Sequence, residues 1–394
     1  MNINTVTEII HNTHVFFGIG AIQKIDYIVE ELKKRGVRSI LCMTGRAAYE
    51  KTGAWKFCTD AFAKHGVKFA LFNKVSSNPN DTEVDEAVAL GKKEGCNAVI
   101  GIGGGSPIDA GKSAAILLSH TDKTCAQLFK YEFTPEKAVP FVAINLTHGT
   151  GSEANRFAVV SVPAEELKPA IATPLIYPAF SIDDPALMTS LPDKQTMYVS
   201  VDAVNHVTEA ATTTCTNPFA ISLALETVKL VAKYLPLAQK DPKNLEARYW
   251  LAYAAMLAGV SFDNGFLHYT HALEHPLSAV KPEVTHALGL GVLLPAVIEE
   301  IYPASAKIVA ELYAPIVPGL KGVPSEAKQA ADGVRNWLKS VGLTERLSDL
   351  GFSKADVPKL VKLTFSTPSL GLMLAAAPTK ATEATVERIF TQSL

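Results

Sequence analysis

Hydrophobic positions in the first half of the chain form short β-branched runs that alternate with amphipathic stretches. Runs of this kind predict strands, and the stretches between them predict helices. Such alternation favours a parallel sheet covered by helices on both faces, with a ligand site beyond the carboxyl ends of the strands. The predicted strands are residues 37–43, 67–72, 98–102 and 139–145, and the clearest helices are residues 47–65 and 82–94.

The pattern changes after about Asp184 and Pro185, where strand-like runs nearly vanish and Ala/Leu-rich helical periodicity dominates. We therefore expect an α/β nucleotide-binding domain over residues 1–186 and an all-α domain over residues 187–394. The active site is expected in the cleft between them. Prolines at 218, 236, 276 and 303 are interpreted as helix ends. The predicted helices are residues 196–211, 219–235, 245–273, 288–301 and 327–341.

A glycine-rich turn follows the predicted strand at residues 98–102 and precedes a helical stretch at residues 108–118. Glycines let a backbone approach a phosphate closely, and a helix N-terminus adds free N–H donors. Ser106 and Pro107 suit the N-cap and first helical positions. The turn is predicted to bind a pyrophosphate, although a tight turn without a ligand fits the same letters. The expected cofactor residues here are Gly103, Gly104, Gly105, Ser106 and Asp109.

A second loop of small hydroxyl residues and glycines covers residues 147–153, directly after the last predicted strand. Thr147 and Thr150 could support the phosphates or the nicotinamide ring of a dinucleotide. A plain loop explains the same residues equally well.

Half of the ten histidines fall in a compact part of the second domain. Asp202 and His206 are four residues apart on a predicted helix, so both side chains project from one face. One carboxylate with several imidazoles suits Fe²⁺ or Zn²⁺ and does not suit Ca²⁺ or Mg²⁺, which prefer oxygen ligands. Core histidines would fit the same spacing, which does not choose among the imidazoles. The clustered histidines are His206, His268, His271, His275 and His286.

Composition narrows the class of protein. Hydrophobic residues make up 48% of the 394 residues and the formal net charge is −2, which predicts a folded protein without affinity for nucleic acid or an anionic membrane. The five cysteines are scattered with no CxxC pair, a pattern typical of a reducing cytoplasm. The first residues lack the basic region of a signal peptide, and no uncharged stretch is long enough to span a bilayer.

Five short segments combine these features in a fixed order: residues 103–109, 149–153, 183–185, 202–209 and 271–277 followed by His286. Their order and spacing resemble those of the iron-dependent (group III) alcohol dehydrogenases over nearly the whole chain. The resemblance implies a Rossmann-like N-terminal domain and an all-helical C-terminal domain, as in dehydroquinate synthase. It also implies hydride transfer between NAD(P)(H) and a small alcohol or aldehyde, and a homo-oligomer such as a dimer.

The resemblance further implies individual roles. One Asp and three His hold the metal in that family, here Asp202, His206, His271 and His286. His275 matches a non-ligand histidine near the nicotinamide and is the implied proton relay. Two departures stand out, since the stretch from His275 to His286 is one residue longer than in several relatives and His268 replaces a small residue.

The cofactor preference rests on the residues after the first predicted strand. NAD-preferring relatives often place an Asp there, where it binds the ribose 2′-hydroxyl. This chain has Gly45 and Arg46 instead, so no carboxylate repels a 2′-phosphate and the guanidinium could bind one. We therefore predict Fe²⁺, with Zn²⁺ as the alternative, and NADP(H) in preference to NAD(H).

Two other functions fit parts of the pattern. A lyase or synthase of the dehydroquinate synthase type shares the fold, but it needs a basic pocket and few Lys or Arg surround the predicted ligands. A non-catalytic nucleotide- or metal-binding module would have little use for clustered imidazoles beside a phosphate turn. Dehydrogenase is therefore the favoured interpretation.

Overall fold

A parallel sheet of six strands organises the first half of the chain in the computed structural model, which describes residues 6–394. The strand order is β1-β8-β5-β4-β2-β3, and every neighbouring pair is parallel. The four predicted strands are confirmed within about two residues, whereas β1 and β8 were missed. The strands are β1 (His14–Phe17), β2 (Ser39–Thr44), β3 (Lys68–Phe72), β4 (Ala98–Gly103), β5 (Phe141–Asn145) and β8 (Phe180–Asp183).

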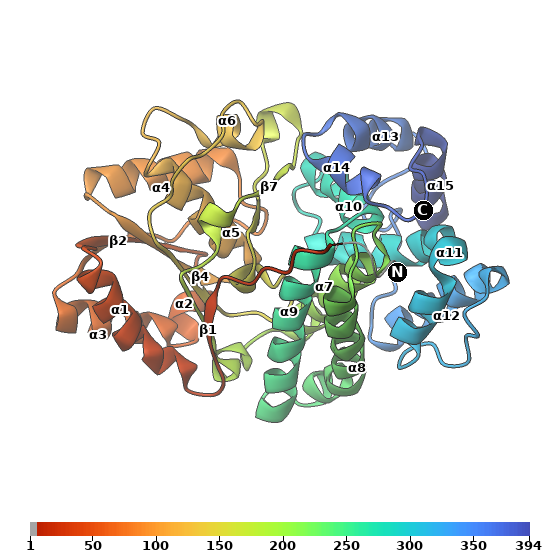
Figure 1. The fold of residues 1–394 in the computed structure, drawn as a ribbon, viewed down its shortest axis with the longest axis horizontal. Helices are drawn as coiled ribbons and strands as arrows, with labels where there is room; N and C mark the ends of the chain where they lie inside the picture. Colours follow the sequence, from red (N-terminus) through yellow and green to blue (C-terminus); the bar gives the residue numbers. More distant parts are fainter. Residues whose placement is uncertain (1–5) are drawn as a thin grey trace.

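Helices cover both faces of this sheet, as the alternating pattern predicts (Figure 1). Strand β2 shows why, because Ile40 and Cys42 belong to one hydrophobic core and Leu41 and Met43 to the other. The predicted helix at 47–65 is in fact two helices, since Gly53 has a φ of +83° between them. The helices are α1 (Ile25–Lys34), α2 (Ala48–Lys51), α3 (Ala54–His65), α4 (Asp81–Lys93), α5 (Gly105–Leu117) and α6 (Cys125–Phe129).

A two-stranded antiparallel ribbon, which the sequence analysis also missed, leads from the sheet toward the second domain. It pairs β6 (Phe157–Val159) with β7 (Ala170–Ala172). Strands of three residues are too short to show a hydrophobic period, which explains the omission.

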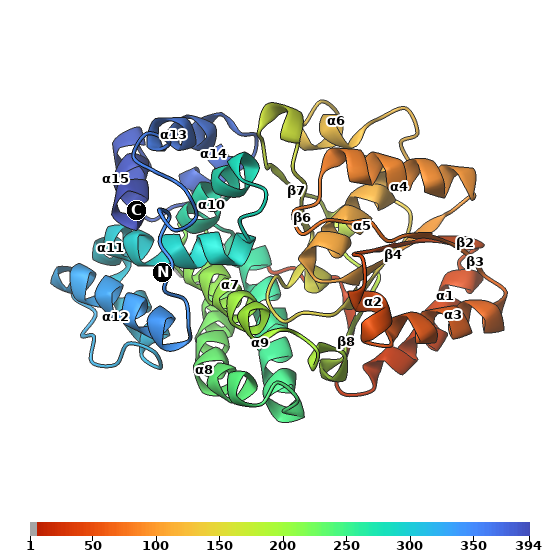
Figure 2. The same ribbon diagram turned by 180° about the vertical axis from the view of Figure 1, so that it is seen from behind.

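The second half is helical and shares one hydrophobic core, beside the α/β half in both views (Figures 1 and 2). The all-α prediction is therefore confirmed. Its helices are α7 (Asp193–Thr212), α8 (Pro218–Lys240), α9 (Leu245–Gly265), α10 (Tyr269–Val280), α11 (His286–Tyr313), α12 (Ala327–Ser340), α13 (Val357–Ser366), α14 (Leu370–Ala375) and α15 (Glu383–Ser393).

Two details of the helical prediction were wrong. The predicted helix at 245–273 is broken after Gly265, where Phe266 has a φ of +64°, so α9 and α10 are separate. Pro236, Pro276 and Pro303 lie inside helices α8, α10 and α11 and do not end them. Tertiary packing of buried helices outweighs the local cost of proline there, and only α11 shows non-helical backbone soon after its proline, at Ser305.

Helix α11 is, within residues 6–394, the one helix whose length and hydropathy would suit a bilayer span. Its apolar window is 78% buried against the rest of the protein. Burial of this kind is that of a core helix. The absence of a signal peptide was predicted partly from residues 1–5, which lie outside the described part of the chain.

The two halves meet through close backbone contacts. The segment before β1 crosses to α9, where Ile10 exchanges two hydrogen bonds with the Asn264 side chain (Figure 1). Gly151, in the loop after β5, packs directly on Gly259 of α9. A Cβ at Gly259 would lie 2.4 Å from the Gly151 carbonyl oxygen, so neither residue can carry a side chain without moving the other.

We predict that Gly259→Ala lowers the free energy of unfolding by about 1–3 kcal/mol, because the added methyl group overpacks this backbone contact. Differential scanning calorimetry would measure the change as a lower Tm. Gly371→Ala is the matched control, since Gly371 lies in α14 with no atom within 4 Å of an added Cβ. An unchanged Tm for Gly259→Ala would contradict the prediction.

Candidate active site

A cleft of about 660 Å³ between the two domains collects nearly all of the predicted site residues. Gly103 is the exception, because it lies behind the turn, where a Cβ would approach Pro107 Cγ to 2.5 Å. The predicted residues that line the cleft are Gly45, Arg46, Gly104, Gly105, Ser106, Asp109, Thr147, Thr150, Asp202, His206, His271, His275 and His286.

The glycine-rich turn links β4 to the N-terminus of α5. The helix begins at Gly105 with Gly104 as N-cap, so the predicted capping role of Ser106 was wrong. Ser106 lies inside the first turn, and its Oγ donates to the Ser77 carbonyl at 2.5 Å. No side chain caps this helix end, and Gly104, Gly105 and Ser106 line the cleft, so the first N–H groups of α5 are donors suited to an anion bound there.

The glycines at 104 and 105 are required by a neighbouring loop as well as by any ligand. A Cβ at Gly104 would lie 2.9 Å from Thr147, and one at Gly105 would lie 2.7 Å from Thr150. Both threonine side chains therefore pack against the bare backbone of the turn. The two predicted cofactor loops form one continuous wall of the cleft as a result.

Asp109 reaches the cleft from α5, but its carboxylate is held by the protein itself. Ser152 Oγ donates to one oxygen and the Val159 amide donates to the other. Burial raises its pKa above the ordinary value, and positively charged Lys112 opposes the shift. The contacts give Asp109 a structural role in joining α5 to β6, in addition to its place at the cleft.

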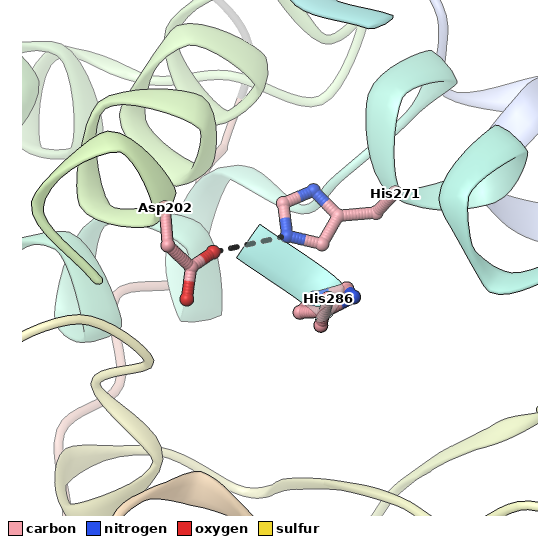
Figure 3. Close-up of side chains that lie close together, drawn as sticks. All are labelled: Asp202, His271 and His286. Carbon is pink, nitrogen blue, oxygen red and sulfur yellow. Dashed lines mark ion pairs between the residues drawn. The ribbon is translucent and has the colours of Figure 1, made fainter. Parts of the chain in front are cut away.

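Three helices bring a carboxylate and two imidazoles together on the opposite wall. Asp202 comes from α7, His271 from α10 and His286 from the first position of α11 (Figure 3). Each offers one ligand atom, and these atoms lie within 4.8 Å of one another. His271 Nε2 is 3.9 Å from Asp202 Oδ1.

His206 lies one turn after Asp202 and beside the same group, as its spacing predicts. Its Nδ1 is 3.5 Å from Asp202 Oδ1. Its ring stacks on that of His271 at 4.6 Å between centroids and on that of Phe262 at 4.5 Å. Burial, aided by the neighbouring His271, lowers the pKa of His206 well below its ordinary value, so the imidazole is neutral and able to bind a metal.

The polar atoms that point into this group lack partners. Asp202 Oδ1, His206 Nδ1 and His271 Nε2 are all buried without a hydrogen bond to any described residue. An unsatisfied buried polar group costs about 1–3 kcal/mol, and several in one place need an explanation. A divalent cation ligated by them would supply it, and the mixed N/O donor set fits Fe²⁺ or Zn²⁺.

Glu209 fixes the orientation of His271. Its carboxylate accepts hydrogen bonds from His271 Nδ1 and from the backbone amide of Thr270. The ring therefore directs its other nitrogen, Nε2, toward Asp202. Although burial alone would raise the pKa of Glu209, the adjacent histidines lower it, so the group is a carboxylate.

Glu274 is the site residue that the sequence analysis missed. It lies on α10, fully buried, and its Oε2 accepts from His286 Nδ1 and lies 3.4 Å from Lys168 Nζ. A carboxylate three residues after His271, within an apolar helical run, was the signal in the sequence. Lys168, in the segment that connects β6 to β7, also lines the cleft.

Of the remaining buried histidines, His275 lines the cleft, and His268 and His148 do not. His275 lines the cleft and its buried Nδ1 has no partner in the described chain. His268 does not line the cleft: its Nδ1 accepts from the Tyr269 amide and lies 3.5 Å from Glu209 Oε1, and its Nε2 is hydrogen-bonded to Thr212 Oγ1. His148 is also buried outside it, and its pKa falls to about 3 because of burial and the nearby Arg248.

Family models match both halves of the chain. The family model for iron-containing alcohol dehydrogenase matches residues 12–185, and that for the C-terminal domain of the Fe-containing alcohol dehydrogenase family matches residues 196–394. A long-chain primary alcohol dehydrogenase of Thermoanaerobacter ethanolicus is 53% identical over 393 residues, which cover 100% of this chain and 98% of that protein. A 1,3-propanediol dehydrogenase of Klebsiella pneumoniae is 31% identical, covering 90% and 93%.

Solved structures agree with this assignment. The NADH-dependent butanol dehydrogenase A of Thermotoga maritima superposes with a TM-score of 0.89 at 28% identity, over 99% of this chain and 98% of that one. The match confirms the predicted fold, and the relatives do not favour the lyase alternative. The chain therefore belongs to the iron-containing alcohol dehydrogenase family and is an alcohol dehydrogenase.

Proposed function

We propose that this alcohol dehydrogenase holds one divalent ion, Fe²⁺ or Zn²⁺, and uses NADP(H) to interconvert a primary alcohol and its aldehyde. One observation carries the proposal: the uncapped N-terminus of α5 and the unpartnered Asp and His atoms line a single cleft. The proposed metal ligands are Asp202, His206, His271 and His286.

The groups of the chain then have distinct tasks. When bound, the nicotinamide exchanges hydride with the carbinol carbon and the metal serves as a Lewis acid toward the substrate oxygen. The first N–H groups of α5 bind the cofactor phosphates, and Thr147 and Thr150 line its path. Phe157 and Phe262 give the cleft an apolar wall that excludes water.

His275 is the proposed proton relay. Its imidazole is buried in the cleft, and burial together with nearby Lys168 lowers its pKa well below the ordinary value, so the ring is neutral. The buried Nδ1 has no partner in the described chain, so the neutral ring has a nitrogen available to take part in a proton relay.

We predict that His271→Ala removes the metal and the activity together while leaving the fold intact. Loss of a Lewis acid worth several kcal/mol corresponds to a fall in kcat of at least about 100-fold. Elemental analysis, activity and circular dichroism on the purified variant measure the three properties. His120→Ala is the control, because His120 lies outside the cleft and is bonded to the Ile116 carbonyl and the Glu136 amide, so this variant is expected to keep its metal. Full metal content in His271→Ala would refute its place among the ligands.

The proposed preference for NADP(H) rests on Arg46. This exposed side chain follows β2 at the cleft wall, and the preceding Gly45 carries no carboxylate. The preference differs from that of the Thermotoga relative, whose name states NADH dependence.

We predict that the wild-type kcat/KM is higher with NADPH than with NADH. Arg46→Asp should lower the NADPH value by about 10–100-fold, the worth of a charged hydrogen bond to phosphate, and change the NADH value little. Lys51→Asp makes the same change of charge on α2, outside the cleft. It is expected to leave kcat/KM unchanged with both cofactors. A wild-type preference for NADH would end this proposal.

We also propose that the cleft binds the aliphatic chain of the alcohol or aldehyde substrate. Phe157, Phe262, Leu267 and Met373 line the cleft that holds the proposed ligands, and one relative is named for long-chain primary alcohols. These side chains offer an aliphatic tail a surface away from water.

We predict that kcat/KM for straight-chain aldehydes rises with each added methylene until the cleft is filled. Burial of a methylene contributes about 0.8 kcal/mol, which corresponds to roughly 4-fold per carbon. Steady-state kinetics on aldehydes of increasing length, at fixed cofactor, measure the slope. A flat series would show that the tail stays in solvent.

The cytoplasmic location and the homo-oligomeric state remain proposals drawn from the sequence. The free state of the five cysteines, four of them buried, fits a reducing compartment. Light scattering on the purified protein would give the oligomeric state.

A further inference from the structure

Glu274 forms a second carboxylate–histidine pair at the proposed metal site. It lies on α10 between His271 and His275, with no exposed surface. Its Oε2 accepts a hydrogen bond from His286 Nδ1, although His286 stands on another helix, twelve residues later. The contact therefore links α10 to the first residue of α11.

The geometry repeats that of Glu209 and His271. In both pairs a buried carboxylate engages Nδ1 of an imidazole, which leaves Nε2 as the nitrogen available to a metal. Carboxylates in this position fix the tautomer and orientation of metal-binding histidines and raise their basicity. Two of the proposed ligands thus have their own carboxylate, each from a different helix.

Lys168, in the segment that connects β6 to β7, forms an ion pair with Glu274. Its Nζ lies 3.4 Å from Glu274 Oε2, donates to Ser278 Oγ at 2.7 Å and donates to Asn78 Oδ1 at 3.1 Å. A lysine ammonium beside the carboxylate makes direct coordination of a second cation by the same oxygen unfavourable.

The fold also reserves space for this side chain. Gly289 of α11 faces Glu274, and a Cβ there would lie 2.8 Å from Glu274 Cγ. The carboxylate passes between α10 and α11 only because α11 carries a glycine at this point.

We propose that Glu274 is a positioning residue, which holds His286 through Nδ1 so that its other nitrogen faces Asp202 and His271, while Lys168 keeps the carboxylate out of the metal's coordination sphere. The inference rests on the ligand set given under the proposed function. The rival role is that of a direct ligand, since Glu274, His275 and His286 also offer ligand atoms within 4.8 Å of one another.

A double-mutant cycle on metal affinity tests the proposal. The dissociation constant of Co²⁺ is measured by chelator competition for the wild type, Glu274→Ala, His286→Ala and the double variant. Loss of an outer-shell partner weakens metal binding by about 10–100-fold, which is the effect expected for Glu274→Ala. Because Glu274 acts through His286, its removal in the His286→Ala background should cost no further affinity.

The outcomes separate the possible roles. Unchanged affinity in Glu274→Ala, with weakened affinity in His286→Ala, would overturn the inference alone. Additive losses, with a Co²⁺ spectrum that reports one ligand fewer in Glu274→Ala, would make Glu274 a ligand and also overturn it. Unchanged affinity in His286→Ala would refute the ligand set, and the inference with it.

Two further variants guard against a general loss of structure. Glu274→Gln keeps the shape of the side chain and is expected to weaken Co²⁺ binding in the same direction by a smaller factor. Glu326→Gln alters another buried carboxylate, bonded to Tyr302 and to backbone amides far from the cleft residues, and should lower the Tm without changing Co²⁺ affinity. A loss of affinity in Glu326→Gln equal to that in Glu274→Ala would show a merely structural effect.

Discussion

The burial of one carboxylate and several imidazoles inside a helical domain is the constraint around which this protein is built. Asp202 is 1% exposed, and burial is the main cause that raises its pKa above the ordinary value. The buried carboxylate and imidazoles lose their hydration whether they are ionised or neutral. They therefore need hydrogen-bond partners or a metal ion, and some of their atoms have no partner in the described chain. Glu209 and Glu274 supply part of this need by accepting from the outer nitrogens of two imidazoles. Asp202 Oδ1, His206 Nδ1 and His271 Nε2 remain unpaired, and they lie together at the proposed metal site.

A continuous chain of contacts connects that place to the phosphate-type turn. Ser106 of the turn donates to the Ser77 carbonyl, and the next residue, Asn78, donates to the carbonyls of Pro282 and Val284. These carbonyls belong to the connection that ends at His286, the first residue of α11. The N-terminal domain therefore braces the loop that carries a proposed ligand.

Features that depend on the spacing of residues within one helix or strand could be predicted from the sequence. Features that depend on contacts between segments far apart in the chain could not. Asp202 and His206 share a helical face because four residues make about one turn. His268 could not be separated from His271 by spacing, since the positive φ at Phe266 breaks the helix between α9 and α10. Glu274 escaped notice because its partner, His286, lies on another helix. Strands β1 and β8, four residues each, were missed because they carry too little pattern and are recognised only by pairing with each other and β5.

Several glycines near the cleft have a packing role that the sequence did not reveal. Gly104 and Gly105 admit Thr147 and Thr150, and Gly151 admits the backbone of α9 at Gly259. The first contacts join two loops of the α/β domain into one wall, and the last seats that wall on the helical domain. Hydride transfer tolerates little error, because a displacement of about 1 Å costs on the order of 100-fold in rate. Backbone packed on backbone has no rotamers to absorb such a displacement. The close contact between Gly151 and Gly259 is thus one of the contacts that set the distance between the half of the cleft suited to a cofactor and the half suited to a metal.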